Sequence, residues 1–175
     1  MAKDNGKVKA ITDLDRLTVP KGTWFKCDVK LWHSTCYLFV GTMDMLHASL
    51  TGAKKVSPPP KMDEAALEFA KKCVSNHLDA RTDGDAFGDG TYAFIRLSNL
   101  CIGELGDMAT LVHECLHAAA GILGAVGVKE VNGEEALAYT QEFLFKHFME
   151  KALELRGLAS AKAGRAMERE VSKKA

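Results

Sequence analysis

Two histidines and a glutamate form the pattern His113-Glu114-x-x-His117, whose residue types and spacing can bind a metal ion. Positions i and i+4 are neighbours on a helix surface, with Cβ atoms ~5–6 Å apart, so both imidazoles can reach one shared ion. Glu114 lies to one side of this pair, which suits a base that takes a proton from a metal-bound water. The pattern therefore predicts a zinc-dependent hydrolase, and we favour a peptidase.

A third metal ligand must come from elsewhere, because a catalytic zinc usually has three protein ligands and one open position for water. The longer pattern H-E-x-x-H-x-x-G-x-x-H is not met, since Ala120 stands at the glycine position and Leu123 at the third histidine. An antiparallel helix packed beside the first would bring its own first turn near the metal. Glu134 and Glu135 occupy that turn, and a thiolate from Cys101 is a further option.

H-E-x-x-H followed by a glutamate on a later helix resembles the gluzincin branch of the zincin metallopeptidases, over residues 91–148. The resemblance implies a bound Zn²⁺, a peptide or protein substrate and a zincin-like helical core. It also implies that the strand before the metal helix, here Tyr92–Leu97, forms the upper edge of the cleft and pairs with an extended substrate. The small size and the string Glu135 to Tyr139 are similar to compact zincin-like proteins encoded by bacteriophages.

This resemblance favours Glu135 as the third ligand. Small residues follow the glutamate ligand in such proteins, and Ala136 and Ala138 follow Glu135 here. The spacing from Asn132 to Glu135 also fits a capping box, in which Glu135 would fold back onto the helix start. In that case Glu134 or Glu130 would be the ligand.

The expected reaction gives Glu114 the role of general base, which then returns the proton to the leaving amine. Thermolysin-like enzymes carry an aspartate at the position of Tyr139, so Tyr139 is expected to replace that support, to donate to the oxyanion, or simply to be a core residue. Four residues are candidate oxyanion donors: Tyr139, Tyr92, Arg96 and His147. The alternative function is a zincin-like metal-binding protein that acts by protein–protein contact rather than by catalysis.

Composition indicates one soluble domain. The 175 residues suffice for one core, and 23 basic residues balance 23 acidic ones, which disfavours binding to nucleic acid or to an anionic membrane. We find no apolar run of the ~18–20 residues that a membrane span requires, and no signal peptide. The five cysteines are odd in number and never form C-x-x-C, which indicates a reducing, cytoplasmic location and no disulfide framework.

The predicted fold is α+β, with a small antiparallel or mixed sheet packed against a zincin-like helical core. We divide the chain into a flexible arm over 1–21, a metal-binding domain over 22–157 and a basic, frayed tail over 158–175. Alternating and continuous apolar runs predict strands, and 3.6-residue periodicity predicts helices. The strands are expected at Phe25–Leu31, Cys36–Val40 and Thr91–Leu97, and the helices at Met43–Leu50, 63–77, 108–123 and from Asn132.

The central helix, 108–123, is expected to begin after a cap at Asp107. Apolar residues line it on both sides of the two histidines, which predicts that most of the helix is buried. We therefore expect His113 and His117 to face an internal cleft that the following helix closes.

Overall fold

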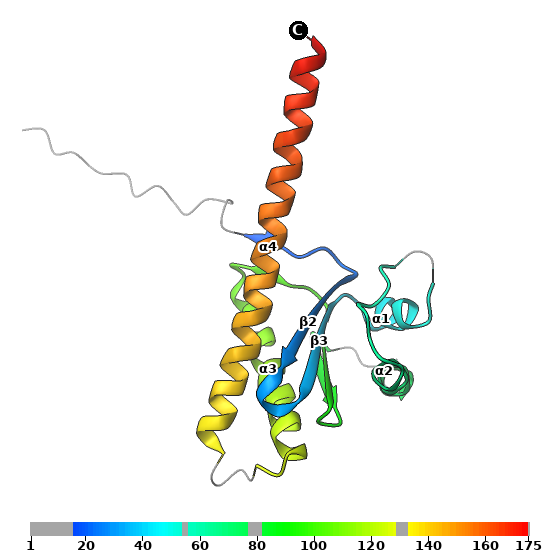
Figure 1. The fold of residues 1–175 in the computed structure, drawn as a ribbon, viewed down its shortest axis with the longest axis vertical. Helices are drawn as coiled ribbons and strands as arrows, with labels where there is room; N and C mark the ends of the chain where they lie inside the picture. Colours follow the sequence, from blue (N-terminus) through cyan, green and yellow to red (C-terminus); the bar gives the residue numbers. More distant parts are fainter. Residues whose placement is uncertain (1–15, 54–55, 77–81, 129–132, 175) are drawn as a thin grey trace, which may run out of the picture.

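The computed structural model describes residues 16–53, 56–76, 82–128 and 133–174, with side chains of the last helix described to residue 155 and at 157. The described chain is α+β and is built in three layers, with a sheet between two pairs of helices (Figure 1).

The central sheet has four strands in the order β2-β3-β5-β4. Their bounds are Thr23–Val29 for β2, Ser34–Val40 for β3, Gly84–Gly88 for β4 and Tyr92–Leu97 for β5. β2 and β3 form an antiparallel hairpin around the short 3-10 helix η2, Lys30–Trp32, whereas β3 pairs with β5 in parallel. β4 adds to the other side of β5 in the antiparallel direction, so the sheet is mixed.

Alternate residues of the strands point to opposite faces of the sheet and fill two separate cores. One core lies beneath α3, Leu105–Ala125, and α4, Glu134–Lys174, and includes Leu38 and Ile95. The other lies beneath α1, Met43–Leu50, and α2, Glu64–Asn76, and is rich in aromatic rings. Figure 1 shows the two helix pairs on opposite sides of the sheet.

Several predicted elements are confirmed. The strands β3 and β5 and the helix α1 form at the predicted positions, and α2 lies within the predicted range 63–77. Asp63 caps α2 by accepting a hydrogen bond from Ala66 N at 2.8 Å. The first predicted strand is shorter at its end, because residues 30–32 turn into η2 and His33 adopts a left-handed conformation with φ 52°.

The expectation that Tyr92–Leu97 pairs with an extended substrate at the upper edge of the cleft is wrong, because both sides of this strand are already paired. This strand, β5, is an interior strand that pairs with β3 on one side and β4 on the other. β4, Gly84–Gly88, forms one edge of the sheet and β2 the other, and β4 lies in a segment for which the sequence predicted no strand. Pairing with β5 holds this glycine-rich segment in an extended conformation despite its low intrinsic preference for strands.

The ends of the two long helices also differ from expectation. α3 begins at Leu105, and Asp107 lies inside its first turn, where its carboxylate accepts a hydrogen bond from Cys101 N at 2.8 Å. The backbone of α4 stays helical beyond Gly157, to Lys174, where a frayed tail was predicted, and it extends beyond the sheet in Figure 1. Alanine, lysine, arginine and glutamate favour helix, which accounts for this continuation.

The predicted N-terminal arm is partly built into the fold. Residues 1–15 lie outside the described part, but β1, Leu17–Thr18, pairs with β6, Cys101–Ile102, and Val19 is buried. Within the described chain, α3 is the helix long and apolar enough to cross a membrane by length and composition. Its apolar face is instead explained by packing against the sheet and α4.

Candidate metal centre

The two motif histidines lie together on one face of α3. Their Nε2 atoms are 3.0 Å apart, and the ring planes meet at 85°. Each zinc–nitrogen bond is ~2.0–2.1 Å long, so two nitrogens at this separation can share one ion. The i, i+4 spacing therefore brings the imidazoles together as the sequence predicted.

The surroundings of the histidines differ from those expected. His113 and His117 are exposed, whereas Glu114 is buried with 6% of its surface accessible. The histidines lie on the side of α3 opposite the residues that pack on the sheet, such as Cys115 and Ile122. The expectation that they face an internal cleft is wrong. Apolar residues flank the two histidines on both sides of the helix surface, but the sequence does not reveal which side a neighbouring element covers.

Glu114 lies between α3 and the edge strand β4. A Cβ atom on Gly84 would come within 2.8 Å of both Cγ and Oε1 of Glu114, and within 2.7 Å of Thr110 Cγ2. Burial raises the pKa of the Glu114 carboxyl, and the neighbouring His113 and His117 oppose this change. A carboxyl group with a raised pKa beside two converging imidazoles is a candidate for general-base chemistry.

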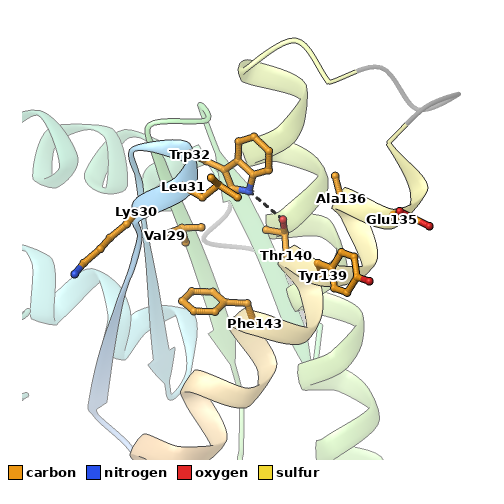
Figure 2. Close-up of a pocket in the computed structure, with 9 residues that line it drawn as sticks. All are labelled: Val29, Lys30, Leu31, Trp32, Glu135, Ala136, Tyr139, Thr140 and Phe143. Atoms are coloured by element: carbon orange, nitrogen blue, oxygen red, sulfur yellow. Dashed lines mark hydrogen bonds between the residues drawn. The ribbon is translucent and has the colours of Figure 1, made fainter.

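The first turn of α4 does not bring Glu135 to the histidines. Glu135 and Tyr139 are exposed and line a cavity of about 500 Å³ between α4 and the β2–β3 hairpin. Figure 2 shows their polar ends directed away from Trp32, whose indole donates a hydrogen bond to Thr140 at 3.1 Å. Leu31 is 76% exposed at the rim of this cavity.

Glu134 lines a different cavity from the one that Glu135 lines. It is exposed and lines a second cavity, of about 360 Å³, together with Ala120, Leu123 and Gly124 of α3. Ala120 is three residues beyond His117 on the same helix. The side of α4 that carries Glu134 is therefore the one that adjoins the histidine-bearing helix. Glu130 and Asn132 lie outside the described residues.

The four candidate oxyanion donors are engaged elsewhere or point elsewhere. Tyr92 Oη donates to Asp63 at 2.8 Å, and His147 Nε2 lies 2.9 Å from the Lys26 carbonyl. Arg96 is buried in an ion pair with Asp85, and Tyr139 is 69% exposed on the first cavity.

The cysteines take no part in this site. Cys27, Cys36 and Cys115 are completely buried, and burial raises the pKa of all three thiols. Cys101 belongs to β6, where its sulfur accepts a hydrogen bond from Thr18 at 3.6 Å.

Within the described part of the chain, no three histidine, cysteine, aspartate or glutamate side chains converge on one metal position. The motif histidines fit zinc as two ligands of the usual three, because both nitrogens converge and both are accessible. The first turn of α4 holds two exposed carboxylates, and neither forms a three-residue metal-binding group with the histidines.

Two features of the site escaped sequence reasoning. Gly84 lets β4 approach Glu114, and Gln141 Nε2 of α4 donates to the Val112 carbonyl of α3 at 3.0 Å, beside His113. The glycines of the segment 84–88 are the signal that could have suggested a close backbone approach.

Comparison with protein-family models, with curated proteins and with solved structures finds no match for this chain.

Proposed function

We propose that this chain is a zinc-dependent peptidase of the zincin type, in which His113 and His117 bind the metal and Glu114 is the general base. The observation that carries this proposal is the 3.0 Å approach of the two Nε2 atoms next to a buried glutamate of raised pKa. A soluble, cytoplasmic protein acting on a peptide or protein substrate is part of the same proposal.

Zinc bound at such a site supplies a Lewis acid for the scissile carbonyl and lowers the pKa of its water towards ~7. Glu114 accepts a proton from the attacking water and returns it to the leaving amine. Its place beneath Gly84 limits access of bulk water to one side of the carboxylate.

The edge strand β4 is the structural element best suited to bind the substrate. Its side remote from β5 pairs with none of the described strands, so its outward amides and carbonyls can bond to an extended peptide. Gly84 of this strand adjoins Glu114, so a peptide bound along β4 would pass close to the general base.

The third ligand in this proposal is Glu135, with Glu134 as the alternative. Both are exposed in the first turn of α4 and are free to change rotamer when the metal binds. Glu134 adjoins α3 through the cavity at Ala120, whereas Glu135 has to turn away from the cavity at Trp32.

The direct test compares zinc content and peptide hydrolysis in the wild type and in Glu114→Gln. Zinc content should persist in the variant, and hydrolysis should fall about 10²–10⁴-fold, the usual contribution of a general base. Glu150→Gln, an exposed glutamate of α4, is the matched control and should keep full activity. A fully active Glu114→Gln variant would contradict the role of Glu114.

The alternative is a zincin-like protein that acts by binding a partner. The exposed apolar side chains of Leu31, Tyr139 and Phe143 around the first cavity favour it. Stoichiometric zinc without hydrolysis across a broad peptide library would select this alternative, and absence of zinc would contradict both metal-dependent proposals.

A further inference from the structure

Arg96 is the largest fully buried side chain of the described residues, with 2% of its surface exposed. It lies on β5, on the face of the sheet opposite α3, and the proposed chemistry does not use it. A guanidinium removed from water requires hydrogen-bond partners with good geometry, because an unpaired buried charge is strongly destabilising. The positions of its partners therefore indicate what Arg96 does.

Two of these partner residues, Thr82 and Asp85, lie just before and within the start of β4. Nη2 of Arg96 donates to the carboxylate of Asp85, to Thr82 Oγ1 at 2.8 Å and to the Thr82 carbonyl at 3.0 Å. Nη1 donates to Ser98 Oγ at 2.7 Å, and Ser98 Oγ in turn donates to the Thr82 carbonyl at 3.0 Å. Thr82 Oγ1 donates to Asp85 at 2.6 Å, which closes the network.

This network fixes the position of Gly84. Asp85 is directly opposite Arg96 in the pairing of β4 with β5, and Gly84 is opposite Leu97. Neighbouring residues of a strand face opposite sides of the sheet, so holding Asp85 on one face fixes Gly84 on the other. Gly84 is the residue that contacts Glu114.

β4 is a short strand at the edge of the sheet. It has five residues, pairs with β5 alone among the described strands and contains glycine at both ends. Phe87 stacks on Phe94 of β5 with ring centroids 5.5 Å apart, and Gly84 packs against α3, so the hydrogen bonds from Arg96 act together with these contacts in setting the register of β4.

We infer that Arg96 is a positioning residue, which anchors the start of edge strand β4 through Thr82 and Asp85 and so holds the strand over Glu114. The consequence for substrate binding rests on the proposed peptidase function, whereas the anchoring of β4 does not.

Hydrogen exchange of the full-length protein tests the anchoring. In Arg96→Met, the β4 amides that pair with β5 should exchange at least about tenfold faster, because charged hydrogen bonds to the strand are lost. Amides of β2 should exchange as in the wild type. Lys151→Met, which breaks an exposed ion pair with Glu154, is the matched control and should leave β4 unchanged. Unchanged exchange in β4, or equal acceleration in every strand, would overturn the inference.

Thr82→Val provides a second variant should Arg96→Met fail to fold. It removes both hydrogen bonds of the exposed Thr82 hydroxyl and keeps the ion pair between Arg96 and Asp85. Faster exchange confined to β4 supports the inference, and wild-type exchange overturns it.

Kinetics then separates positioning from general destabilisation. With peptides long enough to pair along β4, Arg96→Met should raise KM more than it lowers kcat, and Arg96→Lys should restore part of the loss. A fall in kcat alone would overturn the positioning role. A wild type that hydrolyses no peptide would contradict the proposed function, and the exchange experiment would still decide the anchoring of β4.

Discussion

Gly84 of β4 and Glu114 of α3 are in such close contact that a Cβ atom on Gly84 would lie 2.8 Å from the glutamate Oε1. Real Cβ atoms are almost never this close to another heavy atom, so the contact requires glycine. It joins the sheet edge to the helix that carries the H-E-x-x-H motif. The proposed general base, Glu114, is therefore held in place by contact with a residue that has no side chain.

Gly84→Ala should destabilise the protein and displace Glu114. The added methyl group meets Glu114 and Thr110 in a packed interface, and overpacking of this kind costs about 1–3 kcal/mol. Urea unfolding measures the loss. Gly121→Ala is the control, because its Cβ would meet nothing within 4 Å and alanine favours a helix interior by roughly 0.5–1 kcal/mol. Equal stability of Gly84→Ala and the wild type would contradict the close contact.

Periodicity was sufficient to predict most of the elements around this contact. The continuous apolar run of β3 and the i, i+4 pair on α3 depend on local sequence alone, so both could be predicted. β4 could not, because Gly84-Asp85-Ala86-Phe87-Gly88 holds two glycines and no β-branched residue. Its extended conformation comes from pairing with β5, a tertiary effect that single-sequence reasoning does not capture.

The environment of the motif was harder to predict than its position. α3 carries apolar residues on most sides, but the described elements that pack on it, which are the central sheet, β6 and α4, leave His113 and His117 exposed and bury Glu114. The role of Arg96 was predicted from its residue type as a donor to an oxyanion. Its observed partners depend on the register between β4 and β5, which the sequence does not specify.

Zinc titration of metal-free protein distinguishes the two candidate carboxylates. Zinc that binds the folded state raises its stability by RT ln(1 + [Zn²⁺]/Kd), so the melting temperature should rise with zinc concentration. Losing the third ligand weakens binding and lowers this stabilisation by about 1.4 kcal/mol for each tenfold rise in Kd.

We expect Glu135→Ala to reduce the zinc-dependent rise in melting temperature and Glu134→Ala to leave it unchanged. His113→Ala should abolish the rise, and His47→Ala, on α1 across the sheet, should retain it. If Glu134→Ala alone reduced the zinc-dependent rise in melting temperature, Glu134 and not Glu135 would be the third ligand.

The pH dependence of stability should reveal the cap of α2. The hydrogen bond from Ala66 N, followed by that from Tyr92 Oη, lowers the pKa of Asp63 from its ordinary value of 3.8. A carboxyl whose pKa is lower in the folded state binds fewer protons there than in the unfolded chain. The stabilisation of the folded protein by Asp63 is present above the pKa that this carboxyl has in the unfolded chain. It is lost as the pH falls through the pKa that the carboxyl has in the folded protein.

Asp63→Asn keeps an acceptor at the cap but removes this titration. Chemical denaturation between about pH 2 and pH 7 should show that the wild type is the more stable protein at neutral pH and that the difference shrinks in acid. Tyr92→Phe removes one of the two hydrogen bonds and should give a smaller change of the same sign, because the Ala66 bond remains. Parallel stability curves for the wild type and Asp63→Asn would show that the carboxylate of Asp63 is not preferentially stabilised in the folded protein.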